Sequence, residues 1–444
     1  MAFHLTPSIP FLISAEKAKG NPLLQSYLSP RCRLLFPFSL CRTRHVRLHS
    51  CPTIDHGYEV SSASTASTSD TAPLRFLFTG GGSGGHIYPA IAVADEIRNL
   101  SPNAKFLYVG TSSGLESNVV PSAGYDLVTV PASRLVRPLL SPQNFLVPFR
   151  LIRAIAAAWL ILRQFRPHVV VGTGGFVSAP VYLAAAISGI KIAIQEQNVF
   201  PGVSNKIVSA IAAKIFLAFD ACLKHFPKEK CLVYGNPVRL SLRRNVSKAV
   251  ARSHFFPDAL KCGNEKAQVV LVLGGSQGAS TISVAVLNMY YDMLLKNKNR
   301  YIIWQTGQEG FSKMESLVKS HPRLLLTPFL NAMDLAYAAA DVVVSRAGAM
   351  TCTEILITGK PAILIPSPYV AEDHQTNNAC IMVDVAGSKI LTEDELDSTS
   401  LAAVVEELLG DENLMRAISE KALKAALPNA ATNIAESILS LVNI

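Results

Sequence analysis

The stretch Phe76–His86 reads Phe-Leu-Phe-Thr-Gly-Gly-Gly-Ser-Gly-Gly-His, an apolar run that ends in a cluster of glycines. A helical pattern of apolar residues follows at once, over 89–97. A strand, a glycine loop and a helix in this order can bind an anion. The glycines let the backbone approach a ligand, and the helix presents unpaired N–H groups at its start. The stretch therefore predicts an α/β domain with a phosphate-sized loop.

The same plan recurs later in the chain. The apolar run Val269–Leu273 is followed by Gly-Gly-Ser-Gln-Gly-Ala over 274–279. A length of 444 residues suits two domains and a tail, and a hydrophobic content of 49% suits buried parallel sheets. The sequence therefore predicts an α/β fold with two doubly wound, Rossmann-like domains.

Domain limits follow from where strand-like runs alternate with helical patterns. We expect a first domain over 74–238 and a second over 268–425, with an irregular, basic connection over 239–267 between them. Residues 426–444 are expected to hold a C-terminal helix that returns to the first domain. The expected strands are 75–78, 105–109, 126–130, 168–171, 190–194 and 214–217, then 268–273, 301–305, 324–328, 342–345, 362–365 and 389–391. In the first domain, helices are expected over 90–100, 149–164, 179–188 and 203–212.

The first 73 residues have the composition of a targeting segment. Residues 1–54 carry seven Lys or Arg and one acid, Glu16, and so hold +6 of the net charge of +9. A spacer rich in Ser and Thr follows over 61–69. This pattern is typical of an organellar transit peptide. The composition favours a plastid over a mitochondrion as the destination. The segment lacks the apolar core of a secretory signal. A plain disordered tail is the alternative. We expect the protein to act in the chloroplast, on the stromal side of the inner envelope or the thylakoid.

Charge and cysteine content exclude several classes of protein. Only about +3 is left for the chain beyond residue 54, so the domains do not form a nucleic-acid-binding surface by charge. The eight cysteines include no Cys-x-x-Cys pair, and we expect reduced structural thiols without a metal or cofactor. A P-loop motif is absent. Gly80, Gly82 and Gly85 fit the dinucleotide-binding pattern of oxidoreductases. The second strand ends at 108–111 without the acid that binds the ribose in those enzymes, so this class is disfavoured.

The segment 134–166 interleaves apolar side chains with arginines. No run in it reaches the roughly 18–20 apolar residues that cross a bilayer, so we do not expect a transmembrane helix. An apolar surface with a basic rim would suit docking on an anionic membrane. An amphipathic core helix with solvated arginines explains the pattern equally well.

Polar side chains gather where strands are expected to end. His86 follows the first glycine loop at a helix start, where the dipole would keep its imidazole neutral and available as a base. Gln195–Asn198 follow another predicted strand, and Glu354 lies in a helix after a third, where it could accept hydrogen bonds from a ribose. A further polar run, 372–379, is expected on the same side. Solvated loops and ordinary helix caps are the simpler alternatives.

Taken together, these motifs resemble the MurG family, the N-acetylglucosaminyltransferases that make lipid II of peptidoglycan. The resemblance runs in order from about 75 to 440. It rests on Gly81–His86, Gly172–Ser178, Glu196–Asn198, Gly235–Arg239, Gly274–Ala279, Arg346–Glu354 and His374–Ala379.

The resemblance implies a GT-B fold, in which two Rossmann-like domains face each other across a cleft. It implies an inverting, metal-independent transfer from UDP-N-acetylglucosamine to the C4 hydroxyl of lipid I, undecaprenyl-diphospho-N-acetylmuramoyl-pentapeptide, at a membrane surface. The absence of an Asp-x-Asp motif from the sequence fits a transfer without a metal at the diphosphate.

Residue roles are carried over position by position. The resemblance implies catalytic roles for Glu196 and for His86, which would be the base. It implies binding of the acceptor diphosphate by two glycine loops, with the residues Gly81, Gly82, Ser83, Gly84, Gly85, Gly174 and Gly175. It implies donor contacts from Asn198, Arg239, Ser276, Gln277, Phe329, Leu330, Glu354 and Gln375. Where some members have Gln-Gln the chain has His374-Gln375, and the frequent His before Glu196 is Gln195.

Other functions remain open. A plastid galactolipid synthase shares the fold and would suit a transit peptide and a membrane-docking surface, although the doubled glycine loops with Glu196–Asn198 fit lipid I better. A non-catalytic UDP-sugar-binding scaffold would not need His86, Glu354 and Gln375 together. A UDP-sugar epimerase has the two-domain plan but no need of an apolar surface.

Overall fold

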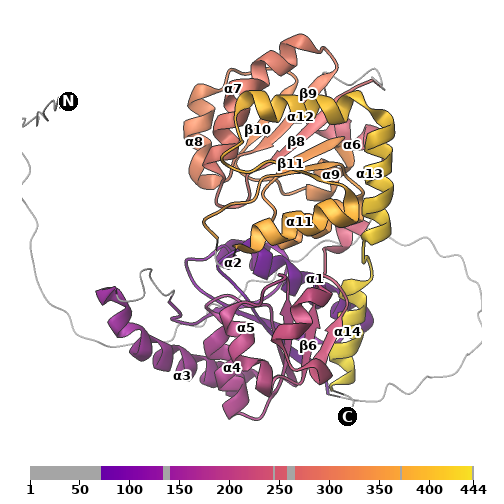
Figure 1. Cartoon of the computed structure of the whole chain (residues 1–444). Helices are drawn as coiled ribbons and strands as arrows, with labels where there is room; N and C mark the ends of the chain where they lie inside the picture. Colours follow the sequence, from indigo (N-terminus) through magenta and orange to yellow (C-terminus); the bar gives the residue numbers. More distant parts are fainter. Residues whose placement is uncertain (1–71, 134–140, 244–245, 258–265, 371–372, 443–444) are drawn as a thin grey trace, which may run out of the picture. The chain divides into compact units, whose positions relative to one another are not determined.

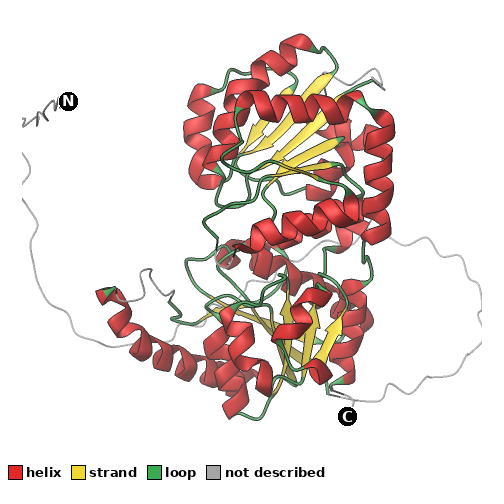
Figure 2. Ribbon diagram, in the orientation of Figure 1, coloured by secondary structure: helices red, strands yellow, loops and turns green. Residues whose placement is uncertain are grey.

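The computed structural model describes residues 72–133, 141–243, 246–257, 266–370 and 373–442. Their strands form two parallel sheets, one of seven strands and one of six, and helices cover both sheets (Figures 1 and 2). The predicted targeting segment, except for residues 72–73, and positions 134–140 of the arginine-rich segment lie outside the described residues.

The first sheet has the strand order β3-β2-β1-β4-β5-β6-β7. Its strands are β1 (Arg75–Thr79), β2 (Lys105–Gly110), β3 (Leu127–Thr129), β4 (Val169–Gly172), β5 (Lys191–Glu196), β6 (Lys214–Leu217) and β7 (Cys231–Val233). The order reverses between β1 and β4, and a glycine loop follows each of these two neighbouring strands. Ligands of open α/β sheets bind at such a switch point.

Helices pack on both faces of this sheet because alternate side chains of each strand point to opposite faces. Phe76 and Phe78 of β1 lie in one buried cluster, and Leu77 lies in the other. The helices are α1 (Gly84–Leu100), α2 (Glu116–Ser122), α3 (Val147–Phe165), α4 (Ser178–Ile187) and α5 (Val203–Val208). Short 3-10 helices are η1 (Pro142–Leu146), η2 (Ser209–Ile211), η3 (Asp220–His225) and η4 (Lys228–Lys230).

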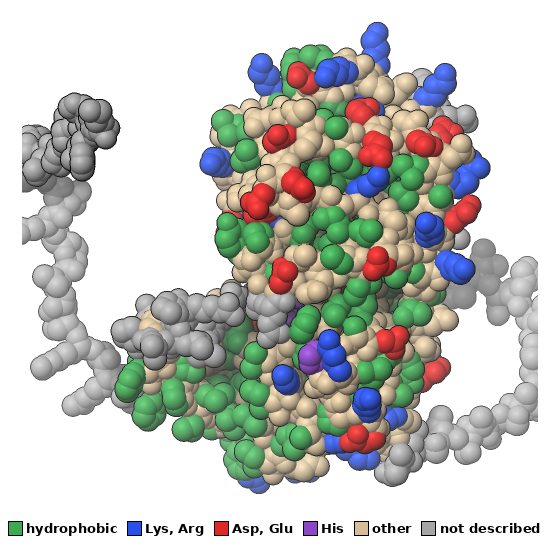
Figure 3. Space-filling model, viewed as in Figure 1, with side chains coloured by type: hydrophobic (Ala, Val, Ile, Leu, Met, Phe, Trp, Pro, Cys, Tyr) green, Lys and Arg blue, Asp and Glu red, His purple; other side chains and the backbone are tan. Residues whose placement is uncertain are grey.

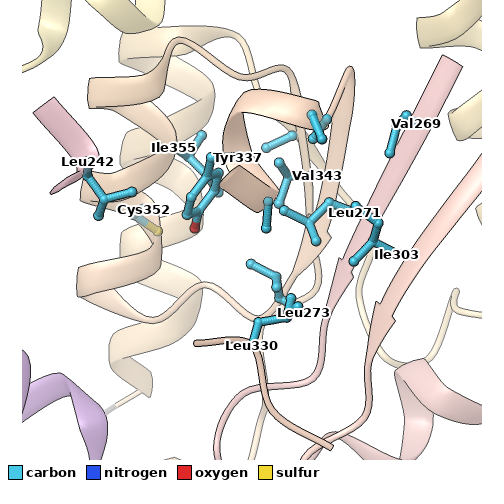
Figure 4. Packing of buried hydrophobic residues seen from close by; sticks show 14 of the residues in the cluster. Leu242, Val269, Leu271, Leu273, Ile303, Leu330, Tyr337, Val343, Cys352 and Ile355 are labelled. Atoms are coloured by element: carbon cyan, nitrogen blue, oxygen red, sulfur yellow. The ribbon is translucent and has the colours of Figure 1, made fainter. Parts of the chain in front are cut away.

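The second sheet has the order β10-β9-β8-β11-β12-β13. Its strands are β8 (Gln268–Leu273), β9 (Arg300–Gln305), β10 (Leu324–Thr327), β11 (Val342–Ser345), β12 (Ala362–Leu364) and β13 (Lys389–Ile390). The helices around it are α7 (Ser280–Lys296), α8 (Gln308–Leu317), α9 (Met333–Ala339), α10 (Ala349–Thr358), α11 (His374–Ala386), α12 (Ser398–Gly410) and α13 (Glu412–Ala425). Figure 4 shows Leu271 and Val343 of the sheet near Tyr337 of α9, in one buried cluster.

The connection between the sheets is more ordered than the sequence predicts. It contains η5 (Leu240–Arg243) and α6 (Lys248–Phe255). Leu242, Ala251 and Phe256 are buried in the core of the second sheet, and Lys248 and Arg252 lie on the same helix as Ala251. At the end of the chain, α14 (Ala430–Ser440) packs against α1, where Thr432 Oγ1 donates to Glu96 Oε1 at 3.0 Å.

Several element limits differ from the prediction. Helix α1 begins at Gly84, inside the glycine cluster, and β5 continues to Glu196. The helix expected over 203–212 ends at Val208 and continues as a 3-10 turn. Helix α2 and strand β7 are not predicted at all, because both are short and without a clear apolar period.

One helical segment of the described residues is long and apolar enough to cross a bilayer by length and composition alone, although the sequence analysis expected no run of that length. The helical segment Asn144–Phe165 has 22 residues, a mean hydropathy of 1.9 and only 17% of its most apolar window buried. However, Ala154, Ala158 and Leu162 are buried, and α3 packs along α4. The helix is therefore attached to the fold by one face and exposed on the other.

Candidate active site

The first glycine loop joins β1 directly to α1. Ser83 is the residue before the helix, and its carbonyl oxygen accepts from the His86 N–H at 3.1 Å. His86 is thus the third residue of α1, in the first turn of the helix. The Ser83 Oγ lies 3.1 Å from His86 Nδ1, so the hydroxyl orients the ring and leaves Nε2 for another group.

The second glycine loop lies against the first. Gly175 has a φ of +86°, and a Cβ built on it would lie 2.3 Å from the Gly81 carbonyl oxygen. Gly174 has a φ of +100°, and a Cβ there would lie 3.4 Å from His86 Nε2. Thr173 Oγ1 donates to the His86 carbonyl oxygen at 2.6 Å. Both glycine loops therefore meet at the His86 imidazole, as the binding of one diphosphate by both loops requires.

Burial lowers the pKa of His86 to about 4. The positive charge of a protonated His374 would lower this pKa further, and a hydrogen bond to the Gly81 backbone and the charge of Glu116 act against the shift. A lowered pKa means that the imidazole is neutral at pH 7 and can accept a proton.

Glu116 is a member of this site that the sequence analysis missed. Its side chain is fully buried. Oε1 accepts from the N–H and the hydroxyl of Thr111, at 3.0 and 2.6 Å, and Oε2 accepts from the Gly82 N–H at 3.3 Å. The absence of a Cβ at Gly81 makes room for the same carboxylate. Glu116 therefore braces the first glycine loop from below, through contacts that no local pattern reveals.

We expect Glu116→Gln to destabilise the chain. The amide would turn an N–H group toward either Gly82 or Thr111 and leave a buried donor without an acceptor, a loss of about 1–3 kcal/mol. Urea unfolding should show this loss, whereas Glu420→Gln, at an exposed position of α13, should change stability by less than about 0.5 kcal/mol. Equal effects in the two variants would contradict the bracing role.

A buried amide network follows β5. Gln195 Nε2 donates to Asn236 Oδ1 at 2.9 Å, and Gln197 Nε2 donates to the Thr173 carbonyl at 2.9 Å and to Gln195 Oε1. Asn236 Nδ2 donates at 3.1 Å to both the Gln197 carbonyl and Thr353 Oγ1 of α10. The network connects the second glycine loop to the helix that carries Glu354.

Glu196 has a different environment from that of His86. Its carboxylate is 1% exposed and accepts from Asn205 Nδ2 at 2.8 Å, the Gly202 N–H at 2.9 Å and the Asn198 N–H at 3.1 Å. Asn198 Nδ2 lies 3.3 Å from the same carboxylate. Burial raises the pKa of Glu196, and these hydrogen bonds oppose the rise. Such contacts suit a residue that shapes the loop carrying Asn198, and a catalytic role for Glu196 stays a prediction.

Arg239 and Glu354 lie close together. The Arg239 Nη2 is 3.9 Å from Glu354 Oε1, and Tyr337 donates to Glu354 Oε2 at 3.0 Å. Burial raises the pKa of Glu354, while Arg239 and the Tyr337 hydrogen bond lower it. The guanidinium also lies over the Tyr88 ring of α1, 4.4 Å from its centroid. The two predicted donor residues are thus brought beside α1, the helix that carries His86.

The glycine loop after β8 is held from behind by Gln305. Its side chain accepts from the Gly275 N–H at 3.1 Å and donates to the Gly275 carbonyl at 2.8 Å. Of the predicted donor residues in the loop, Ser276 is half-buried and Gln277 is exposed. Their side chains are therefore accessible to a ligand in front of α7.

The remaining predicted donor residues are Phe329 and Leu330, which follow β10, and Gln375, at the start of α11. Phe329 is half-buried, whereas Leu330 is 7% exposed and lies in the core near Leu273, so only its backbone is suited to a nucleotide (Figure 4). Gln375 Oε1 accepts from the Ser367 N–H at 2.9 Å, which orients the side chain at the start of α11. Asn198 and Gln375 are thus each held by their own loop.

Over the described ranges, no three His, Cys, Asp or Glu side chains gather in a way that could hold a metal ion. The charged groups at the site include the Arg239 guanidinium and the Glu354 carboxylate, and the helix starts add their dipoles. The prediction of a metal-free transfer stays open to experiment.

Comparison with known proteins places this architecture in a class. The model of the glycosyltransferase family 28 N-terminal domain matches residues 76–217, and that of the C-terminal domain matches residues 269–436. The structure of MurG from Acinetobacter baumannii superposes with a TM-score of 0.61, at 26% identity over 83% of this chain and 100% of that one. Two parallel sheets with these two matches form the GT-B glycosyltransferase fold.

Sequence relatives narrow the class further. Proteins of Flavobacterium psychrophilum and Salinibacter ruber are 42% and 40% identical over 373 residues. The matches cover 83% and 84% of this chain and 98% of each relative. Each relative is named UDP-N-acetylglucosamine–N-acetylmuramyl-(pentapeptide) pyrophosphoryl-undecaprenol N-acetylglucosamine transferase. The chain therefore belongs to glycosyltransferase family 28 and, within it, to the MurG family.

Proposed function

We propose that this chain transfers N-acetylglucosamine from UDP-N-acetylglucosamine to the C4 hydroxyl of a polyprenyl-diphospho-N-acetylmuramoyl-peptide. The observation that carries the assignment of the site is the neutral His86 imidazole where two glycine loops meet, on the helix that contacts Arg239. The printed names of the relatives supply the donor and the acceptor.

The acceptor diphosphate binds to the two glycine loops, where the start of α1 and backbone N–H groups favour an anion. His86 takes the proton of the acceptor hydroxyl, and the hydroxyl oxygen attacks C1 of the donor sugar as the bond from C1 to the UDP oxygen breaks. A direct displacement inverts the configuration at C1. The negative charge of the bound diphosphate also raises the pKa of His86 toward 7. The imidazole is therefore a stronger base when the acceptor is present.

The leaving UDP gains negative charge during this step. Arg239 and the start of α7, behind the Ser276–Gln277 loop, are the groups placed to neutralise it. Glu354 binds the ribose hydroxyls, Phe329 and the backbone of Leu330 contact the uracil, and Asn198 and Gln375 contact the sugar. Glu196 supports this arrangement through the loop that carries Asn198.

A transfer assay tests donor, acceptor and metal together. The full chain is incubated with UDP-N-acetylglucosamine and lipid I, or with UDP-galactose and diacylglycerol, each with and without EDTA. We expect product on lipid I only, at the same rate with EDTA. Product on diacylglycerol alone would assign the chain to galactolipid synthesis, and a strict need for a divalent ion would contradict the metal-free mechanism. Binding of UDP-N-acetylglucosamine without any product would indicate a scaffold.

Helix α3 is the proposed membrane contact. Its exposed face carries Phe145 of η1, Phe149, Ile152 and Leu160, each more than half exposed, and Ile187 of α4 lies 71% exposed beside them. Ile152, Trp159 and Ile187 line one shallow apolar groove. Figure 3 shows hydrophobic side chains gathered on this part of the first half. Exposed arginines at 150, 153, 163 and 166 flank the face, which suits an anionic lipid surface.

We expect the double variant Phe149→Ser, Ile152→Ser to bind anionic vesicles at least about 10-fold more weakly, because two apolar side chains no longer enter the bilayer. Co-sedimentation with vesicles measures the change. Val284→Ser with Leu295→Ser, at two exposed apolar positions of α7, is the matched control and should bind as the unaltered chain does. Equal loss in both double variants would contradict a specific docking face.

We also propose that the protein acts in the chloroplast, on the stromal side of the inner envelope or the thylakoid. The support is the basic, acid-poor composition of residues 1–54 and the Ser- and Thr-rich spacer behind them. A fluorescent protein fused behind residues 1–73 should enter plastids. Import into mitochondria, or a cytosolic signal, would contradict this location.

A further inference from the structure

Tyr88 lies in a position that the proposed mechanism does not use. It is the fifth residue of α1, two positions after His86, and it is half-buried. A Cβ on Gly84 would come within 3.1 Å of Tyr88 Cε2, so the ring lies against the first residue of the helix. One side of the ring therefore lies against the start of α1, next to the loop assigned to the acceptor diphosphate.

What lies on the ring is the Arg239 guanidinium. Its Cζ is 4.4 Å from the ring centroid, which is within the range of a cation–π interaction. The guanidinium forms only a long ion pair with Glu354, whose Oε1 lies 3.9 Å from Arg239 Nη2. Its Nε is buried and has no hydrogen-bond partner among the described residues. The ring therefore holds a cation that is only loosely paired with a carboxylate.

Glu354 is held in a similar way on the other side. Tyr337 donates to its Oε2 at 3.0 Å, so the carboxylate is fixed on α10. If Arg239 moved onto Glu354, a tight ion pair would occupy the cation assigned to the diphosphate and the carboxylate assigned to the ribose. Two tyrosines, one from each half of the chain, thus contact the two members of this long ion pair.

We propose that Tyr88 is a positioning residue for the sugar-nucleotide donor. Its ring keeps Arg239 from closing its long ion pair with Glu354 and leaves the guanidinium available to the donor diphosphate. The affinity for the donor therefore depends on a residue of the helix that carries the catalytic base. The inference rests on the proposed function, which assigns the diphosphate to Arg239 and the ribose to Glu354.

The test uses the full chain with Tyr88→Leu, which removes the π face, and Tyr88→Phe, which keeps it. Calorimetry with UDP should show a dissociation constant raised about 2- to 30-fold in Tyr88→Leu and within about 2-fold of the unaltered value in Tyr88→Phe. Uridine has no phosphates, so its affinity should be the same in all three proteins. In the transfer assay, KM for the donor should rise with the UDP constant, and KM for the acceptor should change less than 2-fold.

A double-variant cycle separates this role from simple packing. In an Arg239→Met background, Tyr88→Leu should not weaken UDP binding further, because the cation that the ring holds is gone. Tyr88→Met serves as a second non-aromatic variant if Tyr88→Leu does not fold.

An unchanged UDP affinity in Tyr88→Leu would overturn the inference and leave the proposed function intact. So would an equal loss in Tyr88→Phe, or the same loss when Arg239 is already absent. A failure of the unaltered chain to bind UDP would overturn the proposed function and the inference together.

Discussion

Replacing His86 with alanine should lower kcat by about 10²- to 10⁴-fold, the usual contribution of a general base. The affinity for UDP should stay within about 2-fold of the unaltered value, because His86 contacts the acceptor hydroxyl and not the nucleotide. Initial-rate kinetics and calorimetry measure the two quantities. His254→Ala, at an exposed position of α6, is the control and should keep full activity. Equal rates in the two variants would remove His86 from the mechanism.

The pH profile gives an independent check on the same residue. The pKa of His86 lies at about 4, below the ordinary 6.5, so the ring remains neutral as the pH falls from 7 to 5. Since kcat/KM reports the free enzyme, it should be level over that range and fall only near pH 4. An acid limb near pH 6.5 would indicate a base with an ordinary pKa, in conflict with the lowered pKa of His86.

Gly175→Ala should lower activity by an amount comparable to that of His86→Ala, because it disturbs both glycine loops. The backbone φ of +86° disfavours any side chain, and the new Cβ would lie 2.3 Å from the Gly81 carbonyl oxygen, which is backbone and cannot turn aside. We expect the two glycine loops to separate, with a loss of roughly 3 kcal/mol or more in stability and at least about 100-fold in kcat/KM.

Gly124→Ala is the matched control for this change. Gly124 has a φ of +78°, but nothing lies within 4 Å of a Cβ built there. It should therefore lose only the roughly 1–2 kcal/mol of the left-handed conformation and keep its activity. Urea unfolding and the transfer assay compare the two variants. If Gly175→Ala were as stable and active as Gly124→Ala, the close contact of the loops would not be essential.

Local patterns predicted the parts of the fold that depend on short-range chemistry. Buried apolar runs located the strands, and glycines after β1, β4 and β8 located three loops at the ends of strands. The start of α1 was placed six residues late, at Ala90 instead of Gly84, because glycine is a poor helix former. In the structure that glycine leaves room for the Tyr88 ring, a tertiary reason that propensity does not contain.

The sequence predicted individual residues of the candidate site but few of the contacts between them. His86, Arg239 and Glu354 were selected one by one, and the structure brings Arg239 and Glu354 beside the helix of His86. Glu116 was missed because its partner Gly82 is 34 positions away and the residue lies in an unpredicted helix. Leu330 was assigned to the nucleotide as a side chain, and its burial in the core was not foreseen, because an apolar residue after a strand fits either role.

The glycosidic linkage in the product tests the proposed inverting transfer to lipid I. The full chain is supplied with UDP-N-acetylglucosamine and lipid I in EDTA, and the new glycosidic bond is identified by NMR of the released disaccharide. We expect a β bond from C1 of N-acetylglucosamine to O4 of the muramoyl sugar, since one base and one displacement invert the donor. An α bond, attachment at another oxygen, or no product from a chain that binds UDP would contradict it.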